Sequence, residues 1–316
     1  MKLLVGFNNK IYPGVNEFKS IGTCKFINYN QQSILKYIAS CDIFIPHLRE
    51  PIDNKILKYA KKLRIIATPS TGKDHIDENE LNKRNIKLIT LFEDRKFLDK
   101  ISSTAEMNWL LILSCIRNFR FLIDRIQKEK KWTNSDIRGY ELQGKTIGII
   151  GFGRLGKKIA KYAETFGMNV LVYDIKKIKH KKKYSFVTLN KLLESADIIS
   201  MNVKLNPTSR QMISFEQVNK MKKGVIFVNT ARGDTVSSRA LIKGLNSGKI
   251  ESIGIDVCNN EYSSSYLPND PLITKSFTDK RIIVTPHAGG ATHDAHNQVF
   301  KKLSDLIKIN ISNKKI

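Results

Sequence analysis

The chain has 316 residues, of which 41% are hydrophobic, and its formal net charge is +25. This length exceeds one ordinary hydrophobic core and predicts two domains, while the apolar content excludes a disordered chain. No apolar run is long enough to span a bilayer, and the short one after Met1 ends at Asn8, which argues against a signal peptide. We therefore expect a cytoplasmic protein with no membrane association.

The positive charge has two interpretations, a nucleic-acid partner or a compositional bias of the whole chain. Lysines are scattered among abundant Asn and Ile, and the one dense run, residues 176–183, has the composition of a solvated face. We therefore expect no nucleic-acid partner. The cysteines form no C-x-x-C pair and no metal-ligand spacing with histidine, which predicts free thiols and no metal site. They are Cys24, Cys41, Cys115 and Cys258.

The first hundred residues alternate β-like runs with helical stretches, a pattern that predicts a parallel sheet covered on both faces. The predicted strands are residues 3–5, 42–45, 64–67 and 87–89. The predicted helices are residues 33–39, 54–61 and 78–84.

Residues 103–120 predict one long helix. Ser103 and Glu106 have the spacing of a capping box, in which both side chains satisfy free N–H groups. The nearly continuous apolar run from Met107 to Leu113 predicts a helix that is buried all round, in the core or against another subunit.

A second alternating series begins near Thr146 and predicts a second α/β domain, inserted in the first. Its predicted strands are residues 147–150, 170–173, 198–201, 225–228, 253–256 and 281–284. Helices are predicted at residues 157–166, which Gly167 ends, and at 301–309.

A glycine turn with the sequence GFGRLG follows a predicted strand and opens a predicted helix, which is the context of a dinucleotide site. Gly151 allows the tight turn, Gly153 lets the backbone approach a pyrophosphate, and Gly156 lets helix and strand pack closely. The helix N-terminus and the backbone N–H groups of Arg154 and Leu155 are expected to bind the phosphates.

Asp174 ends the next predicted strand, where a carboxylate accepts hydrogen bonds from a ribose 2′-OH and repels a 2′-phosphate. The predicted cofactor is therefore NAD. Lys176 and Lys177 lie close by and offset part of that repulsion, so NADP stays open.

Three further side chains, Arg232, Glu261 and His287, follow predicted strands of the second series. Each has an ordinary explanation by itself, as an ion-pair partner, a solvated acid or a loop histidine. Because ligands of open α/β sheets bind outside the carboxyl ends of the strands, the three together favour a catalytic site beside the cofactor.

The ordered motifs of this chain resemble those of the D-isomer-specific 2-hydroxyacid dehydrogenase family over nearly the whole length. The motifs are residues 70–77 (STGKDHID), 103–106 (STAE), 151–156 (GFGRLG), 229–233 (NTARG), 256–261 (DVCNNE) and 285–290 (TPHAGG). The resemblance implies a Rossmann-type doubly wound NAD-binding domain, residues 101–285, inserted in a smaller flavodoxin-like α/β substrate domain, residues 1–100 and 286–316. It also implies a cleft between the domains and a homodimer.

The family's reaction moves a hydride between NAD(H) and C2 of a 2-hydroxy acid or 2-keto acid. His287 would exchange the hydroxyl proton, Glu261 would orient His287, and Arg232 would grip the carboxylate or carbonyl oxygen. By the same resemblance, backbone N–H groups near Thr71 and Gly72 would hold the substrate carboxylate. The cofactor's ribose or nicotinamide side would contact Thr104, Thr230 and Asp256.

Some departures from the family pattern leave the substrate open. Tyr262 stands where proline usually follows the catalytic glutamate, Lys204 replaces another common proline, and residues 91–100 form a longer segment. Arg49 lies about where phosphoglycerate enzymes bind the substrate phosphate, although an ion pair with Glu50 or another neighbour is an equal alternative.

Within the family the chain resembles phosphoglycerate dehydrogenase, and we expect no regulatory domain of the kind that some of those enzymes carry, because the given sequence stops at Ile316. Candidate substrates are 3-phosphoglycerate and the hydroxypyruvate and glyoxylate pairs. The alternatives are an NAD(H)-sensing regulatory protein of the same fold and a phosphonate- or formate-oxidising relative.

Overall fold

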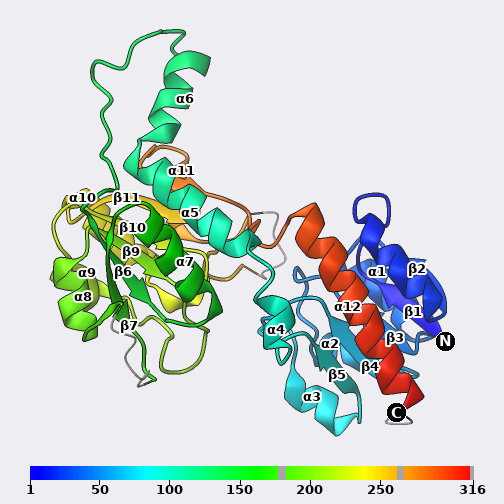
Figure 1. Ribbon diagram of the computed structural model, residues 1–316. Coiled ribbons are helices and arrows are strands. Elements are labelled where there is room, and N and C mark those ends of the chain that lie inside the picture. The colour runs from blue at the N-terminus through cyan, green and yellow to red at the C-terminus, as the bar shows by residue number, and fades with distance from the viewer. Residues whose placement is uncertain (177–182, 262–266, 314–316) are drawn as a thin grey trace. The chain divides into compact units, whose positions relative to one another are not determined.

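The computed structural model describes residues 1–176, 183–261 and 267–313 (Figure 1). These residues form two compact units, and the second is inserted in the chain of the first: residues 1–101 with 291–313, and residues 102–261 with 267–290. Lys177 and Tyr262, on which two of the sequence interpretations depend, lie outside the described residues.

The first unit is built on a parallel sheet with the strand order β2-β1-β3-β4-β5, which confirms the flavodoxin-like prediction. The strands are β1 (Lys2–Val5), β2 (Thr23–Phe26), β3 (Ile43–Ile45), β4 (Ile65–Thr68) and β5 (Lys87–Thr90). The helices are η1 (Pro13–Ser20), α1 (Gln31–Ile38), α2 (Asn54–Leu57), α3 (Glu78–Lys83), α4 (Arg95–Leu98) and α12 (His293–Ser312).

Each face of this sheet carries its own apolar core. Phe18 of η1 and Phe300 of α12 pack on one face, and Ile34 of α1 and Leu81 of α3 pack on the other. The central strand β3 is buried at every residue, as its unbroken apolar sequence predicts for a parallel strand covered on both sides.

The second unit holds a seven-stranded parallel sheet with the order β12-β11-β10-β9-β6-β7-β8. The strands are β6 (Thr146–Ile150), β7 (Asn169–Tyr173), β8 (Ser185–Phe186), β9 (Ile198–Met201), β10 (Val225–Asn229), β11 (Ile250–Ile255) and β12 (Ile282–Val284). This order is the doubly wound Rossmann arrangement with one added edge strand, and its direction reverses between β6 and β9. The predicted fold class is confirmed.

Helices cover both faces of the second sheet. One face carries α5 (Ser103–Ile116) and α7 (Arg154–Thr165). The other carries α8 (Leu189–Ser195), α9 (Phe215–Lys220), α10 (Ser238–Asn246) and α11 (Pro271–Ser276). A short 3-10 turn, η2 (Gly233–Thr235), follows β10.

The prediction of one helix over residues 103–120 was wrong. α5 ends at Ile116, and α6 (Phe119–Gln127) begins after Asn118, whose φ of 51° is left-handed and breaks the helix. The capping box was also wrong, because Ser102 is the N-cap and makes no side-chain capping bond. Within this chain the helix is not buried all round, since Leu110 is 52% exposed; burial against another subunit stays a prediction.

α6 and the extended segment after it project from the rest of the second unit (Figure 1). Several of their large apolar side chains face solvent. Phe119, Ile126 and Tyr140 are about half exposed, and Trp132 is 95% exposed.

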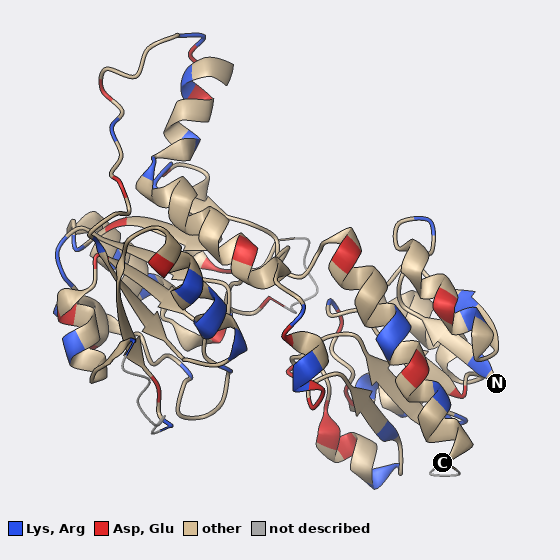
Figure 2. Cartoon of the chain, in the orientation of Figure 1, with Lys and Arg blue, Asp and Glu red and all other residues tan. Residues whose placement is uncertain are grey.

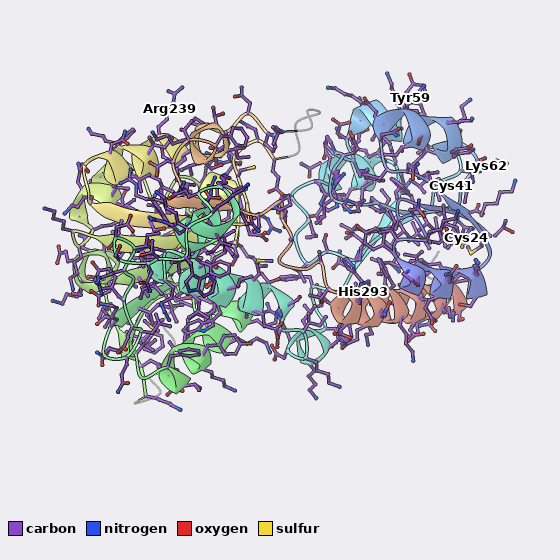
Figure 3. The ribbon with its side chains drawn as sticks, turned by 90° about the horizontal axis from the view of Figure 1, so that it is seen from above. Cys24, Cys41, Tyr59, Lys62, Arg239 and His293 are labelled. Carbon is purple, nitrogen blue, oxygen red and sulfur yellow. The ribbon has the colours of Figure 1, made fainter. Side chains whose placement is uncertain are left out.

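The predictions made from composition can be compared with the structure. All four cysteines are free thiols, as predicted, and two of them, Cys24 and Cys41, are labelled in Figure 3. No helix in the described part of the chain is both long and apolar enough to cross a membrane. Among the same residues, no group of three His, Cys, Asp or Glu side chains could hold a metal ion. Lys and Arg occur on elements of both units rather than on one element (Figure 2).

Candidate active site

The glycine turn between β6 and α7 lies where the second sheet reverses its strand order. Gly151 has a φ of +93°, and a Cβ there would lie 2.7 Å from the carbonyl oxygen of Asn202, the residue that follows β9. Any side chain at this position would therefore strain the backbone and push the two strand ends apart.

Gly156 is tightly packed, whereas Gly153 has open space around it. A Cβ on Gly156 would lie 2.2 Å from the carbonyl oxygen of Gly151, so the helix can pack this closely on the turn only with glycine. A Cβ on Gly153, the N-cap of α7, would meet no atom within 4 Å, so the backbone there faces open space. Arg154 and Leu155 begin α7, and their N–H groups belong to the helix terminus.

Asp174 follows β7 and is tied to the turn. Its Oδ2 accepts a hydrogen bond from the N–H of Phe152 at 2.7 Å, and its Oδ1 accepts one from the N–H of Lys176 at 2.8 Å. Each carboxylate oxygen retains a second acceptor position, which a ribose hydroxyl can use. The turn, the open backbone at Gly153 and this acid fit an NAD molecule.

Asp256, directly after β11, anchors the loop that follows β12. Its carboxylate accepts hydrogen bonds from the N–H groups of Ala288 at 2.8 Å and Gly289 at 2.7 Å, and from the hydroxyl of Thr285. Only 1% of Asp256 is exposed, and this burial raises the pKa of its carboxyl above the usual value although the hydrogen bonds oppose the shift.

His287 lies in the loop that Asp256 holds. Its backbone has a left-handed φ of 53°, and its N–H donates to the carbonyl oxygen of Asp256 at 2.9 Å. Its Nδ1 contacts Oε1 of Glu261 in a short hydrogen bond. Because a carboxylate only accepts, Nδ1 carries the shared proton and Nε2 is left for another partner. The structure thus brings together two of the three predicted catalytic side chains.

Arg232 lies in the loop after β10, directly before η2. The side chains of Asn229 and Thr235 both donate to its carbonyl oxygen, at 2.9 and 2.6 Å, and its own Nη1 donates to the carbonyl oxygen of Ala231 at 2.7 Å. The next residue, Gly233, lies directly on the backbone of Cys258, where a Cβ would come within 2.0 Å of the carbonyl group. The loop with Arg232 therefore packs against the loop with Glu261.

The three predicted substrate-binding residues lie in the first unit. Thr71 and Gly72 follow β4, and the hydroxyl of Ser70 donates to the carbonyl oxygen of Gly72 at 2.6 Å. Arg49 follows β3 and is exposed. Among the described residues, no ion pair joins Arg49 to Glu50, whose pKa is raised by burial.

Comparison with known proteins decides the family of this chain. Residues 109–289, more than half of the chain, match the family model described as D-isomer specific 2-hydroxyacid dehydrogenase, NAD binding domain. This chain belongs to the D-isomer specific 2-hydroxyacid dehydrogenase family. Its cofactor is NAD, and its activity is NAD-linked oxidoreduction of 2-hydroxy and 2-keto acids.

Relatives of this dehydrogenase span most of its length. It is 33% identical to a hydroxypyruvate reductase of Thermotoga maritima, over 88% of this chain and 87% of that one. It is also 33% identical to a glyoxylate reductase of Korarchaeum cryptofilum, over 87% of this chain and 81% of that one. A D-lactate dehydrogenase of Aquifex aeolicus, solved with NAD and lactic acid, matches 99% of this chain and 96% of its own with a TM-score of 0.85 and 26% identity.

The dehydrogenase also holds Thr230 against α5, and Thr104 of α5 beside the loop of His287. Asn108 of α5 donates from Nδ2 to Oγ1 of Thr230 at 3.0 Å, and its Oδ1 accepts from the hydroxyl of Ser200 at 3.0 Å. Gly289 is packed so closely on Thr104 that an added Cβ would lie 3.3 Å from its methyl group. Sequence reasoning missed Asn108 and Ser200; an asparagine stands inside the apolar run of α5, but the sequence does not show which partner it meets.

Proposed function

We propose that Arg232, Glu261 and His287 are the catalytic residues, and that the substrates are small 2-keto acids of the hydroxypyruvate and glyoxylate kind. The observation that carries the proposal is the His287–Glu261 hydrogen bond on loops that buried side chains fix. The relatives named hydroxypyruvate reductase and glyoxylate reductase support the choice of substrate.

His287 moves the proton in this proposal. Glu261 accepts a hydrogen bond from Nδ1 and so holds the ring in one orientation. During reduction Nε2 gives its proton to the carbonyl oxygen of the keto acid. In the reverse direction Nε2 takes the proton of the substrate hydroxyl. The left-handed backbone of His287, fixed by Asp256, sets where the ring points.

Arg232 binds and polarises the substrate. A planar guanidinium can bind a carboxylate or carbonyl oxygen with two parallel N–H bonds, which is the role proposed for Arg232. The backbone N–H groups of Thr71 and Gly72 as carboxylate donors stay a prediction, as does the assignment of substrate binding to residues 1–100 and 286–316 and of NAD binding to residues 101–285.

The NAD molecule would be held by the turn residues, by Asp174 and by the side chains around Asp256. When bound as NADH, it supplies a hydride to C2 of the keto acid. Gly153 and the first N–H groups of α7 bind the pyrophosphate, Asp174 the adenosine ribose, and Thr104, Thr230 and Asp256 the nicotinamide side. The carboxylate of Asp174 disfavours the 2′-phosphate of NADP.

A phosphorylated substrate is the second candidate. The exposed Arg49, which makes no ion pair with Glu50 among the described residues, favours it. A D-3-phosphoglycerate dehydrogenase of Methanocaldococcus jannaschii is 30% identical over 88% of this chain, which covers 51% of that relative. If Arg49 binds the phosphate, Arg49→Ala raises KM for 3-phosphohydroxypyruvate and leaves KM for glyoxylate unchanged.

We also propose a cytoplasmic homodimer that buries α6 and the segment after it. The support is the projecting apolar surface, with Ile123 38% and Trp132 95% exposed. Light scattering after gel filtration tests this: Ile123→Lys with Trp132→Ser should yield monomers. The control Phe277→Ser, which removes another exposed ring (64%), should leave the dimer intact. A wild-type monomer, or a dimeric double variant, would contradict the proposal.

The experiment that tests the function is NADH and NADPH oxidation with a panel of 2-keto acids. We expect turnover of glyoxylate or hydroxypyruvate with NADH, and weaker turnover with NADPH. No turnover with glyoxylate, hydroxypyruvate, pyruvate or 3-phosphohydroxypyruvate, with NADH shown to bind by its fluorescence, would contradict it.

A further inference from the structure

A buried aspartate outside the proposed catalytic group ties down the loop that carries Glu261. Asp270 is 1% exposed, and its Oδ2 accepts hydrogen bonds from the N–H of Asn259 at 2.7 Å and from the hydroxyl of Ser238 at 2.9 Å. Its Oδ1 accepts the N–H of Leu272 at 2.8 Å and so caps α11. Asn259 also donates from Nδ2 to the hydroxyl of Ser238 at 2.9 Å.

These bonds give the loop a fixed point two residues before Glu261. Residues 256–261, which follow β11, form no helix or strand, so their position depends on their contacts. Two of these contacts involve the backbone: the close packing of Gly233 on Cys258, and the hydrogen bond from the N–H of Asn259 to the carboxylate of Asp270. A buried carboxylate that accepts three hydrogen bonds is costly to remove, because each donor would lose its partner.

Two aspartates therefore hold the two partners of the proton-transfer pair. Asp256 fixes the loop of His287 through two backbone N–H groups, and Asp270 fixes the loop of Glu261 through another. Asn260, between the fixed point and Glu261, has a left-handed φ of 54°, so the chain turns sharply there. A small shift of Asn259 would carry Glu261 away from Nδ1 of His287.

We propose that Asp270, with Ser238, is a positioning residue that holds the Glu261 carboxylate against His287. The inference rests on the proposed roles of Glu261 and His287. It differs from them because Asp270 touches neither His287 nor the substrate in this account and acts only through the backbone of Asn259.

Two variants separate this role from helix capping. Asp270→Ser keeps a good N-cap for α11 but supplies one oxygen in place of two, so it cannot also hold Asn259. Ser238→Ala removes one donor to Asp270 and leaves the carboxylate. The matched control is Ser237→Ala, which removes the cap of α10 at the neighbouring position and has no bond to Asp270 or Asn259 among the described residues.

Kinetics and the thiol of Cys258 give independent readouts. Cys258 is half-buried in the same loop, and burial, with the carboxylates of Glu261, Asp270 and Asp234, raises the pKa of its thiol to about 12. Its reaction with a chromogenic disulfide, measured in a Cys24→Ser background, should become faster when the loop loosens. A thiol rate does not depend on which residue moves the proton. Because the Asp270 carboxylate itself raises this pKa, its removal speeds the thiol reaction even in a rigid loop, so Ser238→Ala, which keeps the carboxylate, is the variant whose thiol rate reports loosening alone.

For Asp270→Ser we expect kcat for keto-acid reduction to fall about 10- to 100-fold, with the Kd for NADH within about twofold of wild type. The thiol rate should rise at least about tenfold. Ser238→Ala should lower kcat and raise the thiol rate by smaller factors, and Ser237→Ala should leave kcat and the thiol rate unchanged. If Asp270→Ser fails to fold, Ser238→Ala decides, and wild-type kcat and thiol rate in it would overturn the inference.

A folded Asp270→Ser enzyme with wild-type kcat would also overturn the inference. So would a lower kcat without a faster reaction of the Cys258 thiol. Failure of the proposed function is distinguishable, since it would appear as an active His287→Ala enzyme. If only the inference is wrong, His287→Ala is inactive while Asp270→Ser stays active.

Discussion

The contact of Gly233 with Cys258 allows one substitution to test how the Arg232 and Glu261 loops depend on each other. In Gly233→Ala the new Cβ would lie 2.0 Å from both the carbonyl carbon and oxygen of Cys258, and 2.6 Å from the nitrogen of Asn259. All three atoms belong to the backbone, so no side chain can turn away, and the two loops must separate by roughly an ångström or more.

The magnitude follows from this displacement. A misplacement of about 1 Å in a catalytic group costs on the order of 100-fold in rate, and overpacking of this kind costs about 1–3 kcal/mol of stability. We therefore expect Gly233→Ala to lower kcat for keto-acid reduction about 100-fold and to lower Tm by several degrees. Steady-state NADH oxidation measures kcat and thermal unfolding measures Tm, while NADH fluorescence verifies that the variant still binds NADH.

Gly248→Ala is the matched control. Gly248 has a φ of +70° and no atom within 4 Å of an added Cβ, so the same substitution strains the backbone without moving a neighbour. It should lower Tm and leave kcat unchanged. A folded Gly233→Ala enzyme with wild-type kcat would refute the reasoning, because it would show that Arg232 and Glu261 tolerate separation of their loops.

Three more outcomes follow from the structure. Asp174→Ser should raise the ratio of kcat/KM with NADPH to that with NADH at least about tenfold, because a charge that repels the 2′-phosphate is removed; an unchanged ratio would count against Asp174. With its thiol pKa raised to about 12, Cys258 should react with iodoacetamide about ten times faster per unit of pH between 8 and 10, whereas a plateau below pH 9 would contradict the burial argument. Asn108→Ala leaves the buried hydroxyls of Thr230 and Ser200 without this partner and should cost about 1–3 kcal/mol in urea unfolding; a loss below about 0.5 kcal/mol would contradict that expectation.

The fold was predictable where local sequence and tertiary structure agree. Buried parallel strands such as Ile43–Ile45 and residues 225–228 of β10 are unbroken β-branched and aromatic runs, and the glycine turn carries its own backbone requirement. The break between α5 and α6 had only a weak signal, because it is marked by Asn118, a residue that adopts the left-handed conformation less readily than glycine, and no glycine or proline stands there. The exposure of Leu110 depends on what packs against α5, which periodicity alone does not reveal.

Some residues of the candidate site were predictable from the sequence and others were not. His287, Glu261 and Arg232 could be found because they follow strands that end at one edge of the sheet. The side chains that hold them could not, because their partners are distant in the sequence. Asn108 bonds to a residue 122 positions away, and Asp270 to one 32 positions away. Such buried polar pairs are set by packing and carry no local pattern.

The rate of His287→Ala tests the central claim most directly. At saturating NADH and keto acid, and with NADH binding verified by fluorescence, we predict that kcat for reduction falls at least about 100-fold, because the group that gives the proton to the carbonyl oxygen is lost. A His287→Ala enzyme that is folded, binds NADH and reduces the keto acid at a rate near that of wild type would contradict the account.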